Sequence, residues 1–125
     1  MNKKIFEAGE MYLETLYVLK LESEEVRSVD IVNYTGKAKS SVSQALNTLK
    51  DDGFIIIDEN GYLDFTEKGK KIAFKIYDRH TTLTKVFISL GVSEEQAEED
   101  ACKFEHDISD ETFQAIKKHL EKHKN

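Results

Sequence analysis

The sequence predicts a mainly α-helical protein with one small β-hairpin, arranged as a winged helix-turn-helix over residues 1–70 and a helical region over residues 71–125. Three observations lead to this fold class. Apolar residues recur with a helical period in several segments, and an Asn-Gly pair separates two β-rich runs near the middle of the chain. A short helix, a second helix and this hairpin follow one another in the order typical of a winged helix.

The N-terminal half supplies the helices of the helix-turn-helix. Residues 9–22 have apolar side chains with a helical period and form a first core helix. Ser28 caps a short second helix, and a glycine-containing break at 34–36 precedes a third helix that starts at Ser40. The apolar residues of the third helix stand at i, i+3, i+4 and i+7, namely Val42, Ala45, Leu46 and Leu49. This is the pattern expected of a recognition helix, because the polar side chains are left on the outer faces.

The hairpin and three further helices complete the prediction. Runs 54–57 and 62–65 are rich in β-branched and aromatic residues and flank Asn60-Gly61, a strong hairpin signal. Thr66 precedes a long helix that keeps a 3.6-residue apolar period up to Gly91. Ser93 matches a capping box and begins a helix whose apolar stripe reaches Ile108, and Ser109 begins a last helix. The last helix has too narrow an apolar face for a core of its own, so we expect these helices to dimerise.

Charge, cysteine content and hydropathy limit the possible functions. The net charge of -6 argues against broad, unspecific binding to nucleic acid, so any DNA contact must come from a local basic surface. The single cysteine excludes an internal disulfide and leaves a thiol for metal or redox chemistry. No apolar run approaches the ~20 residues needed to cross a bilayer, and glutamates interrupt what would be the apolar core of a signal peptide. We therefore expect a cytoplasmic protein with no membrane partner and no small-molecule substrate.

Potential metal ligands lie near both ends of the chain. Cys102, Glu105 and His106 are spaced by three and four residues, so on a helix all three lean toward one face. Met11 and Glu14 share a face of the first helix in the same way. A cation that joined the two faces would tie the N-terminal helix to the C-terminal region. Taken singly, each residue has an ordinary explanation, such as a core-filling Met11, a small buried Cys102 or a solvated Glu14.

Several motifs occur in the same order as in a known family. These are Glu10-Met11-Tyr12-Leu13-Glu14, Val42-Ser43-Gln44, Asp52-Gly53, Thr66-Glu67-Lys68-Gly69, Arg79-His80 and Cys102-x-x-Glu105-His106-x-x-Ser109-Asp110. Over nearly its whole length the chain resembles the diphtheria toxin repressor family of iron- and manganese-dependent transcription regulators. The resemblance implies a winged helix-turn-helix DNA-binding domain plus a helical dimerisation and metal-binding domain. In length the chain is similar to the short form, without the SH3-like domain of the iron branch.

The resemblance also implies a set of metal ligands. They would be Met11, His80, Cys102, Glu105 and His106, with Glu14 at a position that is a ligand in the manganese branch. In the iron branch a second site combines His80 with positions occupied here by Thr84 and Glu98, so His80, Glu98 and Glu14 could form a different one. Thioether and thiolate donors favour softer ions, whereas carboxylates favour Mn(II). Fe(II) is the favoured cofactor and Mn(II) the second choice, and Co(II), Ni(II) or Zn(II) could bind in vitro.

The third helix and the basic residues around it are the candidate DNA contacts. In the family, the position that matches Gln44 reads a base, and a glutamine can bond an adenine edge. The other candidates are the polar Ser40, Ser41, Ser43 and Asn47, and the phosphate-binding Arg27, Lys37, Lys39 and Lys50. The expected partners are double-stranded DNA and a second copy of the chain. A dimer would repress transcription from palindromic operators, with recognition helices about one helical turn, ~34 Å, apart.

Two other functions are compatible with these residues. A winged-helix regulator could sense oxidation at Cys102, or a protein partner, instead of a metal. A metalloenzyme could use the Cys, Glu and His cluster, but the sequence has no Gly-rich phosphate loop and no base beside a nucleophile. We therefore expect a regulator and not an enzyme.

Overall fold

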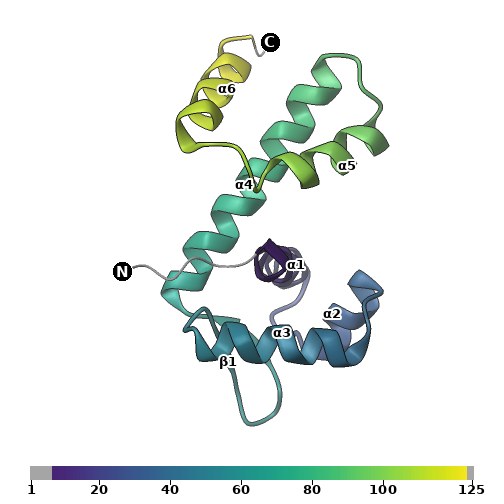
Figure 1. Cartoon of the computed structure of the whole chain (residues 1–125), viewed down its shortest axis with the longest axis vertical. Helices are drawn as coiled ribbons and strands as arrows, with labels where there is room; N and C mark the ends of the chain where they lie inside the picture. The colour runs from purple at the N-terminus through teal and green to yellow at the C-terminus, as the bar shows by residue number, and fades with distance from the viewer. Residues whose placement is uncertain (1–6, 124–125) are drawn as a thin grey trace. The chain divides into compact units, whose positions relative to one another are not determined.

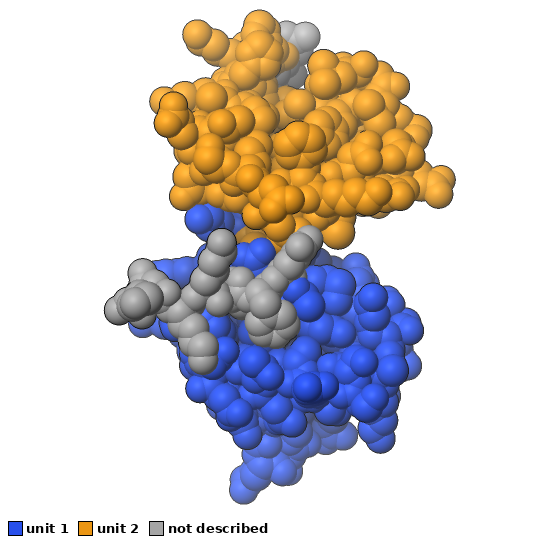
Figure 2. All heavy atoms as spheres, in the orientation of Figure 1, with its two compact units in different colours: residues 1–75 blue, residues 76–125 orange. Residues whose placement is uncertain are grey.

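The computed structural model describes residues 7–123, and the start of the predicted N-terminal domain, residues 1–6, lies outside this range. The elements are α1 (Glu7–Glu22), α2 (Ser28–Thr35), α3 (Lys39–Asp51), β1 (Ile55–Ile57), β2 (Leu63–Phe65), α4 (Glu67–Ser89), α5 (Glu94–Phe104) and α6 (Asp110–Lys122) (Figure 1). They confirm the mainly helical fold with one hairpin. The chain forms two compact units, Met1–Lys75 and Ile76–Asn125, whose boundary falls inside α4 (Figure 2).

The first unit is built around one apolar core. Helices α1, α2 and α3 and the hairpin all contribute to it, and Leu16, Ile31 and Phe54 are almost fully buried. The core side of α3 consists of Val42, Leu46 and Leu49. Because these three positions fix the rotation of α3, its polar side chains face solvent, as a recognition helix requires.

The predicted cap of α2 and the predicted start of α3 each differ from the structure by one residue. Helix α2 begins at Ser28, so Arg27 occupies the N-cap, and its backbone N–H donates to Asp30 Oδ2 at 2.9 Å. The side-chain hydrogen bond at this helix start is therefore made by the Asp30 carboxylate to the N-cap N–H, and not by the predicted serine hydroxyl. Helix α3 begins at Lys39, one residue before the predicted Ser40.

The wing is an antiparallel hairpin in which Ile55 pairs with Phe65 and Ile57 with Leu63. In its turn, Asp58 Oδ1 accepts the backbone N–H groups of residues 60 and 62 at 2.8 and 2.9 Å. Gly61 takes a φ of 84°, a left-handed conformation that other residues rarely adopt. The Asn-Gly signal thus marks the turn correctly.

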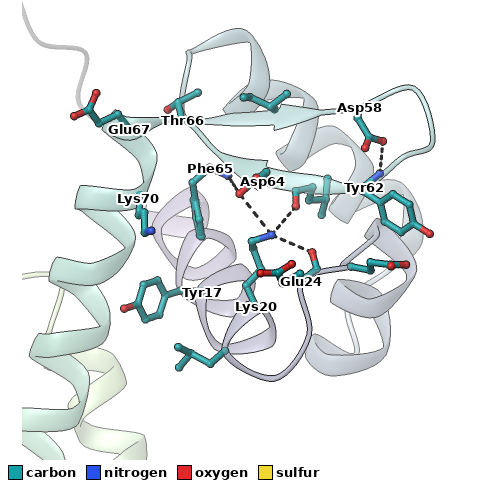
Figure 3. Close-up of a pocket in the computed structure, with 14 residues that line it drawn as sticks. Tyr17, Lys20, Glu24, Asp58, Tyr62, Asp64, Phe65, Thr66, Glu67 and Lys70 are labelled. Carbon is teal, nitrogen blue, oxygen red and sulfur yellow. Dashed lines mark hydrogen bonds and ion pairs between the residues drawn. The ribbon is translucent and has the colours of Figure 1, made fainter.

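Lys20 ties the end of α1 to the wing (Figure 3). Its Nζ donates to the carbonyl oxygens of Glu24 and Leu63 at 3.1 and 3.4 Å, and it lies 3.5 Å from Asp64 Oδ1. The ammonium of Lys20 thereby donates hydrogen bonds to backbone carbonyls of two segments. Without it, these carbonyls would have to bond to water.

The second unit contains the C-terminal part of α4 together with α5 and α6. The hydroxyl of Ser93 accepts the backbone N–H of Gln96, and that of Ser109 accepts the backbone N–H of Thr112, which confirms both predicted caps. Helix α5 ends at Phe104, so the expectation that it continues to Ile108 is wrong. The chain turns there, with Asp107 N–H bonded to the carbonyl of Phe104 at 3.2 Å, a three-residue spacing that tightens a helix end. Among residues 7–123, no helix is both long and apolar enough to cross a membrane.

Gly69 allows α4 to pack closely against the wing. A Cβ atom at this position would lie 1.8 Å from the carbonyl oxygen of Phe54. We expect Gly69→Ala to lower the free energy of unfolding by about 1–3 kcal/mol, since backbone must move to relieve the overlap. Urea unfolding followed by circular dichroism measures this. The control Lys71→Ala, exposed in the same turn, should stay within about 0.5 kcal/mol of the wild type. If Gly69→Ala unfolded at the same urea concentration as the control Lys71→Ala, the close packing at this position would be refuted.

Candidate metal centre and DNA-binding surface

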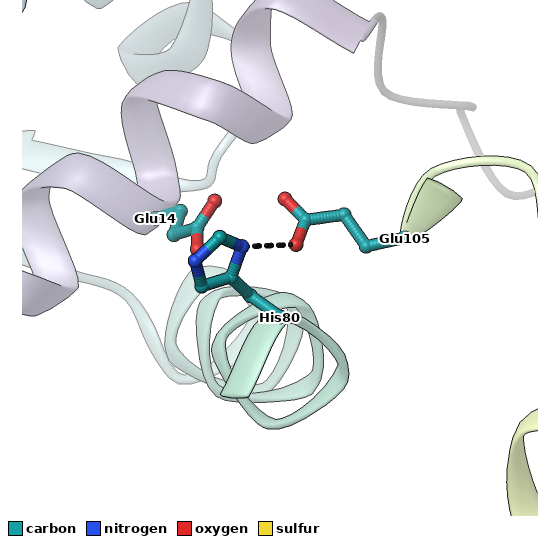
Figure 4. A group of neighbouring side chains, drawn as sticks. All are labelled: Glu14, His80 and Glu105. Carbon is teal, nitrogen blue, oxygen red and sulfur yellow. Dashed lines mark hydrogen bonds and ion pairs between the residues drawn. The ribbon is translucent and has the colours of Figure 1, made fainter. Parts of the chain in front are cut away.

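The carboxylate of Glu105 is the centre of a polar cluster in the second unit. Glu105 is only 1% exposed and stands immediately after α5. Its Oε2 lies 2.9 Å from Nδ1 of His80, which reaches it from α4 (Figure 4). Its Oε1 lies 3.5 Å from Nε2 of His106, in the turn that follows. Two imidazoles therefore meet one buried carboxylate.

One oxygen of this carboxylate is not satisfied. Oε1 of Glu105 is buried and accepts no hydrogen bond from any residue that the structure describes. A buried polar atom without a partner costs free energy, and the cost is larger for an ionised group. A divalent cation would remove this cost, because it binds carboxylate oxygen and imidazole nitrogen together. Such a donor set suits Mn(II), Fe(II) or Zn(II), so the residues present fit a transition metal.

The contact between His80 and Glu105 also depends on protonation. An ionised carboxylate only accepts hydrogen bonds, so a distance of 2.9 Å requires one proton shared between Nδ1 and Oε2. A cation that bound Oε2 and Nδ1 would take the place of this hydrogen bond.

The remaining predicted ligands lie on helices of both units. Cys102 and Glu98 are exposed on α5, whereas His106 lies in the turn beyond this helix. The expectation that Cys102, Glu105 and His106 share one face of a single helix is therefore wrong, because α5 ends before the last two. Met11 and Glu14 are half-buried on α1 of the first unit. Within the second unit, the structure brings together His80, Glu105 and His106.

The sequence pattern alone assigned no role to Arg79, which is only 7% exposed. A signal was nevertheless present. The apolar stripe of α4 begins at Ile72 and continues through Ile76 and Leu83. Position 79 lies between the last two at helical spacing, on the same face. A charged residue at a core position of an amphipathic helix needs partners in the interior.

The polar face of α3 is available for DNA. Lys37, Lys39, Ser40, Ser41, Gln44, Asn47 and Lys50 are exposed, and Ser43 is half-buried. Arg27 is exposed beside the wing, where its guanidinium carbon lies 4.3 Å from the centroid of the Tyr62 ring. This cation–π contact restricts the arginine without neutralising its charge.

A groove of about 940 Å³ lies between the end of α1, the wing and the start of α4 (Figure 3). Its acidic lining residues are Glu24, Glu25, Asp58, Asp64 and Glu67, against the basic Lys20 and Lys70. This excess of negative charge repels phosphate groups. This groove is therefore an unfavourable surface for DNA.

Comparison with known families confirms the resemblance. Residues 4–69 match the iron dependent repressor N-terminal DNA-binding domain, and residues 66–125 match the iron dependent repressor metal-binding and dimerisation domain. The chain is 33% identical over 118 residues to an uncharacterized HTH-type transcriptional regulator of Methanocaldococcus jannaschii, covering 92% of this chain and 94% of the relative.

Two characterised relatives are similar as well. The transcriptional regulator MntR of Salmonella typhimurium is 32% identical over 112 residues, covering 90% of this chain and 71% of that protein. The iron-dependent repressor IdeR of Mycobacterium bovis is 26% identical over 121 residues, and the chain spans only 52% of its length.

Solved structures show the same fold. A manganese-dependent transcriptional repressor in complex with manganese superposes with a TM-score of 0.81 at 22% identity, covering 90% of this chain and 52% of that one. IdeR of T. acidophilum gives a TM-score of 0.77 at 23% identity, covering 94% and 55%. The two family matches and the fold together show that this chain belongs to the iron-dependent repressor family of metal-dependent, DNA-binding transcriptional regulators, which are not enzymes.

Proposed function

We propose that this protein represses transcription from palindromic operators as a dimer when Fe(II) or Mn(II) is available. One observation carries the proposal: a buried carboxylate with an unsatisfied oxygen stands beside two imidazoles, in a chain whose other unit is a winged helix. The buried cluster acts as the sensor and the exposed face of α3 as the reader. We expect it to act in the cytoplasm, where the sequence analysis places it.

The second unit supplies His80, Glu105 and His106 as ligands in this proposal. Met11 and Glu14 would complete the coordination from α1, with Cys102 or Glu98 as further donors on α5. A bound cation supplies positive charge and a fixed coordination geometry. Ligands from both units would then restrict α1, and with it the helix-turn-helix core that α1 shares with α3. Two recognition helices held at one spacing bind two half-sites at once.

The chemistry of the cluster supports Fe(II) or Mn(II) more than a soft ion. Its donors are a buried carboxylate and two half-buried imidazoles, while the thiol of Cys102 is exposed. Oxygen and nitrogen donors suit Mn(II) and Fe(II), whereas thiolate would shift the preference toward softer ions. In vitro affinity follows the Irving–Williams order, so the tightest metal in solution does not identify the physiological one.

A second candidate signal rests on the same exposed thiol. Cys102 lies three residues before Glu105, and its exposure makes it accessible to peroxide. In this alternative, oxidation would control DNA binding and the carboxylate cluster would be structural. Each signal can be applied separately, so one experiment distinguishes them.

The first test is an anaerobic pull-down of sheared genomic DNA with Fe(II), Mn(II), chelator or peroxide, followed by sequencing of the retained fragments. We expect discrete palindromic sites with one or both metals and their loss with chelator. Equal retention with metal and chelator would remove metal as the signal. Retention that depends on peroxide would support Cys102 oxidation instead.

Glu105→Gln tests the metal centre directly. The amide keeps the size of the side chain but removes the charge, so Mn(II) affinity should fall roughly 100-fold or more, beyond the 10–100-fold typical of outer-shell changes. Isothermal titration calorimetry measures it. The control Glu99→Gln removes an exposed carboxylate on α5 whose ion pair among residues 7–123 is with Lys103 at 3.8 Å, and it should leave the affinity unchanged. Equal losses in both variants would show a general charge effect rather than coordination.

Base reading and phosphate binding can be separated on α3. Gln44→Ala should weaken binding to the operator by about 1–3 kcal/mol and leave unspecific DNA almost unaffected, because it removes a base contact. Lys39→Ala should weaken both equally and reduce the salt-dependence slope by about 0.9, because it removes a phosphate contact. Fluorescence anisotropy over a series of salt concentrations measures both effects. Identical behaviour of the two variants would contradict these assignments.

A further inference from the structure

Arg79 precedes His80 on α4 and reaches across the turn between α5 and α6. Its Nη1 donates to the carbonyl oxygens of Glu105 at 3.1 Å and Ile108 at 2.7 Å. Its Nη2 donates to the carboxylate of Asp110, the first residue of α6. One guanidinium therefore holds three points of the segment 105–110.

Segment 105–110 contains Glu105 and His106, two of the three proposed metal ligands in the second unit. The carbonyls of residues 105 and 108 lie on either side of His106 in the chain, and the first belongs to Glu105 itself. The end of α5 leaves backbone carbonyls without helical partners, and these need donors from elsewhere. Arg79 supplies them from the same helix that supplies His80. The orientation of both ligands thus depends on one anchored turn.

Stability alone does not explain this arginine. The side chain of Arg79 is 9% exposed, but that of Asp110 is 65% exposed, and an ion pair with a solvated partner contributes little. Nε of Arg79 is buried and finds no acceptor among residues 7–123, which is a further cost. A buried ionic group can often be replaced by an apolar one without loss of stability. The geometry that the guanidinium imposes on the turn is the property that an apolar residue would lack.

We propose that Arg79 is a positioning residue of the metal centre. It holds the turn 105–110 so that Glu105 and His106 present their donors beside His80, and it connects this turn to the start of α6 through Asp110. The inference rests on the metal-binding function proposed above and adds a residue that acts on the ligands through their backbone. Lysine is not equivalent here, because a single Nζ cannot occupy the two separate positions from which Nη1 reaches both carbonyls and Nη2 reaches the Asp110 carboxylate.

A second ion pair offers a matched control. Lys117 Nζ lies 2.8 Å from Asp78 Oδ2 and joins the same two helices, α6 and α4. Its side chain is 37% exposed, and it bonds to neither Glu105 nor His106. Lys117→Met therefore weakens the attachment of α6 to α4 without releasing the turn.

The experiment compares the wild type, Arg79→Lys and Lys117→Met in two measurements. Co(II) affinity is read from its visible absorption in the full chain, with His119 and His123 replaced by glutamine in all three proteins, because their rings lie 4.2 Å apart and could chelate the probe. Hydrogen exchange is measured without metal at the backbone N–H groups of Glu105 and Asp107, which bond within α5 and its terminal turn.

We expect Arg79→Lys to lower Co(II) affinity about 10–100-fold, the range found for groups that orient metal ligands, and to accelerate exchange at both amides. Lys117→Met should change neither. Wild-type affinity and exchange in a folded Arg79→Lys variant would overturn the positioning role while leaving the proposed function intact. A wild-type protein that binds no Co(II) would overturn both.

A second variant, at an exposed position, tests the proposal even if Arg79→Lys fails to fold. Asp110→Asn removes the negative charge from one of the three anchor points, at an exposed position, and leaves both carbonyl bonds in place. It should give a smaller loss of Co(II) affinity in the same direction, about twofold to tenfold, with faster exchange at Asp107. An Asp110→Asn protein indistinguishable from the wild type in both measurements would overturn the connection to α6.

Discussion

The buried carboxylate of Glu105 is the constraint on which the arrangement of the second unit depends. An ionised group removed from water costs several kcal/mol unless it is paired, and each neighbouring element supplies a partner or support for it. His80 comes from α4 and His106 from the turn after α5, yet Oε1 still accepts no hydrogen bond from any described residue. In the proposed function, a cation bound at this cluster would relieve the cost of the unsatisfied oxygen, so part of the affinity for metal would be built into the fold.

The first unit is organised by a different physical effect. Its core is apolar, and the three buried residues Val42, Leu46 and Leu49 fix the rotation of α3 without any ionic contact. Apolar packing within the first unit therefore decides which side chains of α3 face solvent. With acidic side chains lining the groove beside the wing and a net charge of -6, attraction to DNA is confined to a small basic surface. A regulator built this way has little affinity for arbitrary sequences, and control over the placement of its reading helix has a large effect.

Features set by local chemistry could be predicted from the sequence, and features set by tertiary contacts could not. The caps at Ser93 and Ser109 and the turn at Gly61 depend on residues within four positions, and all three were correct. The end of α5 depends on the turn at residues 105–107. The sequence does not indicate this turn, because Glu105 continues the four-residue spacing of the buried Ala97 and Ala101 and so extends the helical pattern. Likewise, a carboxylate is by default solvated, so its burial became evident only with the histidines around it.

The turn between α5 and α6 links two properties that the family match assigns to one region, metal binding and dimerisation. One end of this turn carries Glu105 and His106, two of the proposed metal ligands. The other end leads into α6, whose attachment to α4 includes the ion pair of Asp78 with Lys117. If ordering the turn favours both processes, thermodynamic linkage requires that metal strengthen the dimer by the same factor by which the dimer strengthens metal binding. A sensor with this coupling responds to metal more steeply than two independent sites would, because each bound cation also favours the assembly that binds the next.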